Sequence, residues 1–126
     1  DYYFLARRAL TPDFFAPEAL ADYRRCWNDP ATIHAMCEDY RAGVTFDYAL
    51  DEQDRFAGRR ITAPLLALWG SGNAVGTWYD VLAVWHDWAN DVSGRALPCG
   101  HYLAEEAPDE TYAELRAFFQ ATPTAG

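Results

Sequence analysis

The sequence is poor in basic residues and in cysteine, and it has no long apolar run. Ten Lys and Arg residues stand against 19 Asp and Glu residues in 126 positions, so the formal net charge is -9. Binding of phosphate groups needs clustered basic side chains, so we expect neither nucleic acid nor an anionic membrane as a partner. The sequence also lacks the roughly 20 consecutive apolar residues of a membrane-spanning helix. These absences predict a soluble, cytoplasmic protein.

Cysteine is scarce and irregularly spaced. The three cysteines, Cys26, Cys37 and Cys99, are an odd number without a Cys-x-x-Cys pair. This pattern argues against a disulfide framework and against a zinc knuckle. We interpret Cys26 and Cys37 as core residues, and the sequence predicts no metal site and no cofactor.

Apolar and aromatic residues are plentiful. Hydrophobic residues make up 51% of the chain, with five Trp, eight Tyr and seven Phe. This content is sufficient for a hydrophobic core, and the length corresponds to one domain or to part of one.

Residues 1–60 have the periodicity of helices. The clearest predicted helix runs from Pro30 to Gly43, with Asp29 as its N-cap. Its apolar side chains recur at i, i+3, i+4 and i+7 and should pack as one buried stripe: they are Ile33, Met36, Cys37 and Tyr40. Further helices are expected over residues 1–10, from Pro17 to Trp27 and over residues 51–58.

Residues 61–126 have a different character. Pro64–Gly70 is an apolar run without alternation, which is typical of a strand buried on both faces of a parallel sheet. A helix is predicted next, with Thr77 and Asp80 as its capping box; its core face would contain Trp78, Val81, Leu82, Trp85, Trp88 and Ala89. A second strand is expected over 95–98, and a last helix from Pro108 should turn Tyr112, Leu115, Phe118 and Phe119 inward. The order strand, helix, strand, loop, helix predicts the α/β class.

One histidine is distinguished by its position. His101 follows Gly100 directly after the second predicted strand and precedes a helix start. Ligands bind on the loops beyond the carboxyl ends of parallel strands, and imidazole is the usual general base near neutral pH. His101 is therefore the candidate catalytic residue, and the alternative interpretation is a structural histidine in a turn.

Three segments resemble the C-terminal part of an α/β-hydrolase: Cys37–Gly43 (CEDYRAG), Leu66–Gly70 (LALWG) and Pro98–Glu106 (PCGHYLAEE). The Trp-Gly and Gly-His pairs are general to that superfamily, whereas CEDYRAG is typical of its haloacetate (fluoroacetate) dehalogenases. The resemblance covers about residues 15–119. It implies the C-terminal portion of an α/β-hydrolase fold, with residues 1–60 as a helical cap segment and residues 61–126 as part of the core.

The resemblance also implies a chemistry. In that family an aspartate attacks the halogen-bearing carbon, and a histidine-activated water then hydrolyses the resulting enzyme ester. The histidine corresponds to His101, and Tyr40 corresponds to a tyrosine that holds the departing halide. A carboxylate nucleophile needs no deprotonation, whereas hydrolysis of its ester needs a base. The implied partner is a small-molecule substrate, a short haloacid or ester. Without this resemblance, Tyr40 would simply be a buried member of its helical stripe.

The nucleophile is missing from this sequence. In hydrolases the nucleophile elbow precedes the acid and the histidine, but neither Gly-x-Ser-x-Gly nor Gly-x-Asp-x-Gly occurs here. Gly70-Ser71-Gly72 lacks the spacing. Asn73 stands where many hydrolases carry the triad acid, which agrees with a group whose acid follows the preceding strand. We expect a fragment that is inactive alone and that self-associates or pairs with the missing N-terminal part.

The remaining titratable residues have simpler interpretations. His34 and His86 lie on predicted helices without a partner at metal-ligand spacing. Adjacent carboxylates on a helix do not face each other, so two such pairs are expected to be solvated: Glu38 with Asp39, and Glu105 with Glu106.

Three functions are open at this point. The first is a dehalogenase of short haloacids. The second keeps the fold and the histidine but changes the chemistry to that of an esterase or an epoxide hydrolase, and the residue at the missing elbow distinguishes it from the first. The third is a non-catalytic acidic interaction domain, which predicts that His101→Ala has no measurable effect.

Overall fold

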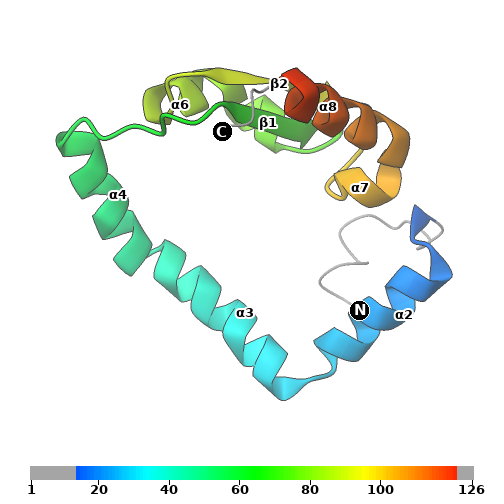
Figure 1. Ribbon diagram of the computed structural model, residues 1–126. Coiled ribbons are helices and arrows are strands. Elements are labelled where there is room, and N and C mark those ends of the chain that lie inside the picture. Colours follow the sequence, from blue (N-terminus) through cyan, green and yellow to red (C-terminus); the bar gives the residue numbers. More distant parts are fainter. Residues whose placement is uncertain (1–13, 122–126) are drawn as a thin grey trace. The chain divides into compact units, whose positions relative to one another are not determined.

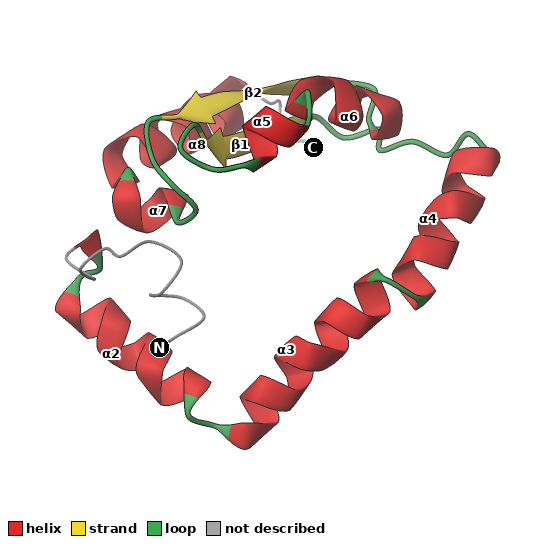
Figure 2. Cartoon of the chain, turned by 180° about the vertical axis from the view of Figure 1, so that it is seen from behind, coloured by secondary structure: helices red, strands yellow, loops and turns green. Residues whose placement is uncertain are grey.

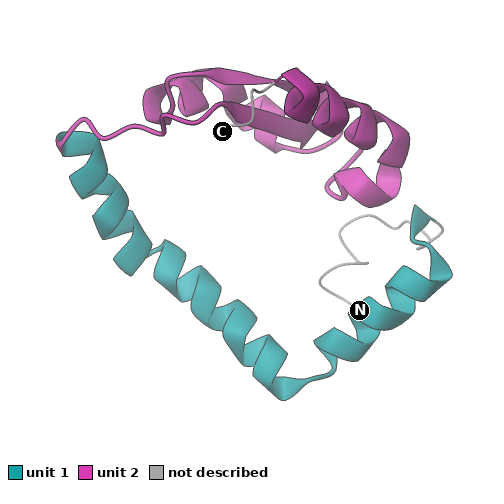
Figure 3. Cartoon of the chain, in the orientation of Figure 1, with its two compact units in different colours: residues 1–56 teal, residues 57–126 magenta. Residues whose placement is uncertain are grey.

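The computed structural model describes residues 14–121 of the chain. The predicted helix over residues 1–10 lies outside the described residues. Figure 3 shows the division of the chain into two units, Asp1–Phe56 and Ala57–Gly126. Every helix within residues 14–121 is too short or too polar to cross a membrane.

The first unit is built from helices. The helices α2 (Pro17–Trp27), α3 (Pro30–Gly43) and α4 (Phe46–Phe56) follow one another, and α3 contacts both neighbours (Figure 1). The predicted helices from Pro17 and from Pro30 are confirmed. At the start of α3 the carboxylate of Asp29 accepts a hydrogen bond from the Ala31 N–H at 2.9 Å, as an N-cap should.

The helix α4 begins earlier than the sequence predicts. It starts at Phe46 instead of residue 51. Two residues, Val44 and Thr45, are enough to separate it from α3, because the Thr45 hydroxyl donates to the Arg41 carbonyl at 2.6 Å and so satisfies the end of that helix.

The apolar stripe of α3 is exposed. Ile33, Met36 and Tyr40 are all solvent-accessible, and Tyr40 is 66% exposed. The prediction of a buried stripe is wrong, and so is the interpretation of Cys37 as a core residue, whereas Cys26 is half-buried. The neighbours α2 and α4 adjoin the two ends of α3 (Figure 2), so no second layer covers the stripe within the described part of this unit.

The second unit contains a two-stranded parallel sheet. The strands β1 (Leu65–Gly70) and β2 (Val92–Leu97) pair from Leu65↔Val92 to Gly70↔Leu97. The helices α5 (Val75–Trp78) and α6 (Val81–Trp88) connect them, and α7 (Leu103–Glu106) and α8 (Pro108–Ala121) follow. The predicted order of elements, the parallel pairing and the α/β class are confirmed.

The second strand begins at Val92, before the predicted start at residue 95. Gly94 lies inside the observed strand with a φ of 145°. A Cβ at this position would overlap the carbonyl group of Ala67 on the neighbouring strand. The glycine is therefore required by the close approach of two backbones, which the local sequence does not reveal.

The helix between the strands is broken in two. Thr77 lies within the short helix α5, and Asp80 is the N-cap of α6, accepting a hydrogen bond from the Ala83 N–H at 3.1 Å. The predicted capping box with Thr77 as N-cap is therefore wrong. A single Asx cap at Asp80 replaces it.

The buried core of this unit lies between the sheet and α7. Leu97, Cys99 and Ala107 form it, with Leu68 and Leu103 packed against it. The next residue of β1, Trp69, points to the opposite face. There α5 comes so close that a Cβ on Gly76 would lie 2.8 Å from the Trp69 indole nitrogen. Helical segments therefore cover both faces of β1.

Several aromatic side chains that the sequence predicts to be inward are exposed. Trp78, at 70% exposure, and Trp85 on the segment between the strands are accessible, as are Tyr112 and Phe119 on α8. These predictions are wrong because two strands present too little sheet surface to cover the whole apolar side of each helix.

Candidate functional site

His101 lies where both strands end. The loop after β1 and the loop after β2 are joined by two backbone hydrogen bonds: the Ser71 N–H donates to the Leu97 carbonyl at 2.8 Å, and the Gly72 N–H donates to the Cys99 carbonyl at 2.9 Å. His101 therefore lies beyond the carboxyl end of a parallel strand, as predicted. The site is thus built on loops held together by main-chain bonds.

A glycine at the end of β1 allows the two loops to touch. A Cβ on Gly70 would overlap the carbonyl oxygen of Gly100 and would lie 2.7 Å from that of Cys99. The loop that carries His101 therefore crosses directly over the backbone of Gly70. Any side chain at this position would push the histidine loop away.

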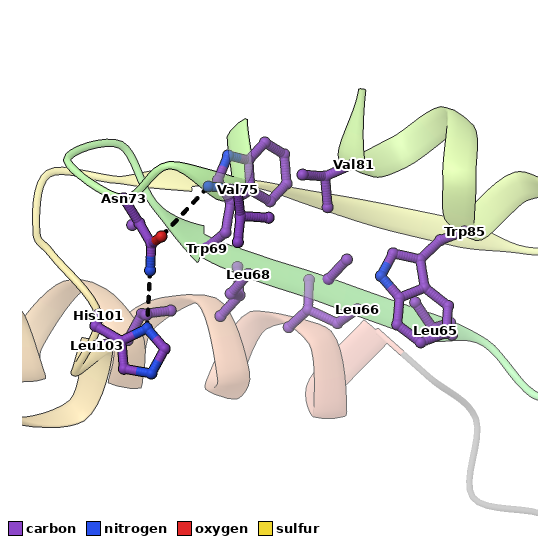
Figure 4. A pocket seen from close by; sticks show the side chains of 12 residues that line it. Leu65, Leu66, Leu68, Trp69, Asn73, Val75, Val81, Trp85, His101 and Leu103 are labelled. Atoms are coloured by element: carbon purple, nitrogen blue, oxygen red, sulfur yellow. Dashed lines mark hydrogen bonds between the residues drawn. The ribbon is translucent and has the colours of Figure 1, made fainter. Parts of the chain in front are cut away.

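Asn73 holds the imidazole from the first loop. Its amide nitrogen Nδ2 lies 2.8 Å from Nδ1 of His101, and its oxygen Oδ1 accepts a hydrogen bond from the Val75 N–H at 3.3 Å (Figure 4). Because Oδ1 is occupied by a donor, the group facing the ring is the amide N–H. Nδ1 of His101 then accepts, which places the ring proton on Nε2.

This tautomer has a chemical consequence. A histidine that takes a proton from water through Nε2 must carry its own proton on Nδ1 and needs an acceptor there. The amide of Asn73 offers a donor, so it cannot serve as the acid of a catalytic triad in this arrangement. The acceptor would have to come from another segment.

Glu106 is the second residue that contacts the histidine loop. Its carboxylate accepts from the Gly100 N–H at 2.5 Å through Oε2 and from the Tyr102 N–H at 3.1 Å through Oε1. The prediction that Glu106 is solvated is wrong, because the side chain is half-buried and turned back over α7. The bond from the N-cap N–H of Tyr102 to Glu106 resembles one half of a capping box, but the acidic residue of a capping box stands three positions after a Ser or Thr N-cap. Glu106 stands four positions after Tyr102, so the sequence carries no such signal for this contact.

The imidazole opens on a cavity along β1. The cavity has a volume of about 470 Å³ and follows the edge of β1 away from β2, since all six residues of that strand line it (Figure 4). Its remaining lining residues are Asn73, Val75, Val81, Trp85, His101 and Leu103. Apart from Asn73 and His101, the lining side chains are apolar.

Tyr40 lies on α3 in the first unit, whereas His101 belongs to the second unit. Nearby on the same helix, Arg41 forms an exposed ion pair with Glu38, and Nε2 of His34 lies 3.9 Å from the same carboxylate. The halide-binding function of Tyr40 stays a prediction.

Over residues 14–121, no group of three or more His, Cys, Asp or Glu side chains could hold a metal ion.

Comparison with curated proteins finds hydrolases. No known protein-family profile matches the sequence. A fluoroacetate dehalogenase from Burkholderia sp is 40% identical over 110 residues, which are 87% of this chain and 36% of the relative. A soluble epoxide hydrolase from Corynebacterium sp. (strain C12) is 31% identical over 110 residues, 86% of this chain and 36% of that protein. The chain therefore spans little more than a third of the length of these relatives.

Comparison with solved structures also finds an α/β-hydrolase. A candidate α/β-hydrolase from Nostoc sp PCC 7120 is 50% identical and superimposes with a TM-score of 0.83, over 89% of this chain and 38% of the other. At this identity and this TM-score the likeness includes both sequence and fold.

Proposed function

The chain has the fold of the C-terminal portion of an α/β-hydrolase, and we propose that the full-length protein is a hydrolase that removes halide from a short haloacid. The observation that carries this proposal is the 40% identity with a fluoroacetate dehalogenase over 110 of the 126 residues. A continuous stretch of that length necessarily includes both Tyr40 and His101.

The proposed reaction has two steps. A carboxylate from another segment attacks the carbon that bears the halogen, the carbon–halogen bond breaks, and halide leaves while an enzyme ester forms. His101 then takes a proton from water, and the resulting hydroxide attacks the ester carbonyl. The C–O bond to the substrate breaks, the leaving oxygen takes the proton back from His101, and the hydroxy acid is released while the restored carboxylate loses the second proton of the water to solvent. The Tyr40 hydroxyl donates a hydrogen bond to the departing halide. The acceptor for the Nδ1 proton of His101 is a second carboxylate outside this chain.

The experiment that tests this function is halide release from fluoroacetate and chloroacetate by the full-length protein, beside its His101→Ala variant. The wild type should release halide continuously. The variant should release about one halide per active site and then stop, with an ester on an aspartate detected by mass spectrometry of the intact protein. If neither haloacid loses halide while a simple ester is cleaved, the dehalogenase proposal is refuted and only the hydrolase fold remains.

A second candidate function is epoxide hydrolysis. It is favoured by the 31% identity with a soluble epoxide hydrolase. The same protein preparation should be assayed with a small terminal epoxide. Diol formation without halide release would favour this alternative, and an unchanged rate in His101→Ala would instead favour a non-catalytic function for the chain.

A further inference from the structure

We propose that Glu106 is a positioning residue that fixes the backbone on both sides of His101 and thereby orients its imidazole. This inference rests on the proposed function, because it assigns Glu106 an effect on the step in which His101 acts. The carboxylate binds the backbone N–H groups of the loop, so this influence passes through the main chain.

Glu106 binds the backbone on both sides of the histidine. The two N–H groups bound by Glu106 belong to Gly100 and Tyr102, the residues immediately before and after His101. One oxygen serves each donor, at 2.5 Å and 3.1 Å. Hydrogen bonds to an ionised carboxylate are roughly twice as strong as neutral ones. The two N–H groups belong to the peptide units 99–100 and 101–102, so the two bonds together restrict the backbone torsion angles of Gly100 and His101, which lie between those units.

The backbone that carries Glu106 is held in place by its neighbours. The next residue, Ala107, is buried in the core with Leu97 and Cys99. At the first residue of α7, the Leu103 carbonyl accepts a hydrogen bond from the Thr111 hydroxyl of α8 at 3.0 Å, so α7 is joined to α8. The carboxylate therefore extends from a fixed point, which is what a positioning residue requires.

A glutamine cannot make both contacts. Its amide has one acceptor oxygen and one donor nitrogen, so one of the two backbone N–H groups would face another donor. Glu106→Gln thus keeps the size of the side chain and removes half of the restraint. Glu110 on α8 provides the matched control, since it is an exposed glutamate whose substitution by glutamine leaves the loop intact.

The two steps of the proposed reaction separate this effect from a loss of folding. His101 acts only when the ester is hydrolysed, so a misplaced imidazole slows the second step and leaves the first unchanged. A displacement of about 1 Å costs on the order of 100-fold in rate. A purely structural defect would instead lower both steps in proportion to the amount of folded protein.

The experiment is rapid-quench halide release from chloroacetate by the full-length protein. Glu106→Gln should give a burst of about one halide per active site, followed by a steady rate about 100-fold below the wild type. Glu110→Gln should behave as the wild type does. The proposal is overturned if Glu106→Gln keeps the wild-type steady rate, or if burst and steady rate fall together. Should Glu106→Gln not fold, Glu106→Asp, which keeps the charge with a shorter reach, must show the same burst.

A second readout keeps the proposal testable if the proposed function fails. Without halide release by the wild type, the dehalogenase assignment falls, and the ring nitrogens of His101 can still be followed by NMR with 15N-labelled histidine. His101 signals are identified by their absence in His101→Ala. They should shift or broaden in Glu106→Gln and not in Glu110→Gln. Identical spectra for the two glutamine variants would refute the positioning effect independently of any substrate.

Discussion

At the scale of single residues, His101 is held by two neighbours that use opposite hydrogen-bonding groups. Asn73 presents an amide N–H to Nδ1, whereas Glu106 presents only acceptors to the backbone on either side. The first contact selects a ring tautomer, and the second restrains where the ring can lie. A water-activating histidine needs the restraint but also needs a different partner on Nδ1. Within residues 14–121 the histidine loop is therefore held in place, and the partner of Nδ1 is the Asn73 amide.

Tyr40 allows a test of the halide site at the same scale. Its side chain is 66% exposed, so Tyr40→Phe should change the free energy of unfolding by less than about 0.5 kcal/mol. Loss of the hydroxyl removes a donor to the departing halide and should slow halide release by about 100-fold. Halide release by the full-length protein, measured together with denaturant unfolding, checks both expectations.

Tyr48 on α4 is the control for this substitution, because it is exposed to a similar extent, at 61%. Tyr48→Phe should leave the rate of halide release unchanged. Equal rates for the two phenylalanine variants would remove Tyr40 from the proposed halide site without affecting the assignment of His101.

At the scale of secondary-structure elements, the crossing of the histidine loop over β1 depends on one glycine. Gly70→Ala would place a methyl group against the carbonyl oxygens of Gly100 and Cys99. Relief of this overlap requires a backbone shift, which should lower the free energy of unfolding by about 1–3 kcal/mol. The same shift would displace the loop that carries His101, so hydrolysis of the enzyme ester should also slow. Denaturant unfolding and halide release check the two effects.

Gly43, the last residue of α3, is the matched control for Gly70. No atom lies within 4 Å of a Cβ built at this position. Gly43→Ala should therefore leave activity unchanged and should raise the free energy of unfolding by up to about 1 kcal/mol, because alanine loses less backbone entropy on folding. A loss of stability in Gly43→Ala comparable to that in Gly70→Ala would show that the overlap at Gly70 is not the cause.

The elements that the sequence predicts correctly are those with local signals. Pro17 and Pro30 mark helix starts, Asp29 supplies a cap, and the apolar run of Leu65–Gly70 marks a buried strand. The start of β2 is missed because Gly94 is selected by contact with Ala67 on the neighbouring strand. Contacts between segments distant in sequence leave no periodic pattern.

The same distinction applies to the candidate site. The position of His101 is predictable from the order of strand, glycine and helix. The contact between Asn73 and His101 joins residues on two different loops and becomes evident only when β1 and β2 are paired. Glu106 is misassigned because adjacent carboxylates suggest a solvated helix face, whereas α7 is a single turn on which the side chain reaches back to Gly100.

At the scale of the whole molecule, apolar surface is unusually accessible. Phe56 is 87% exposed, and Val44 and Trp78 are also largely accessible. The cavity along β1 adds a further apolar surface beside the strand edge that faces away from β2. Large apolar patches and unpaired strand edges favour association. We therefore expect the 126-residue chain, produced alone, to self-associate and to bind a hydrophobic dye.

Net charge supplies a way to test the cause of this association. A formal charge of -9 on every copy opposes contact between copies, and salt screens that repulsion, with a screening length of about 10 Å at 0.1 M. If apolar surfaces drive the association, the mass measured by light scattering after size exclusion should rise as salt is increased from about 0.05 M to about 0.5 M, because salt screens the repulsion between the acidic copies. Association through ion pairs would weaken over the same range. A monomer at every salt concentration, without dye binding, would contradict the prediction and would mean that these surfaces are covered within one copy.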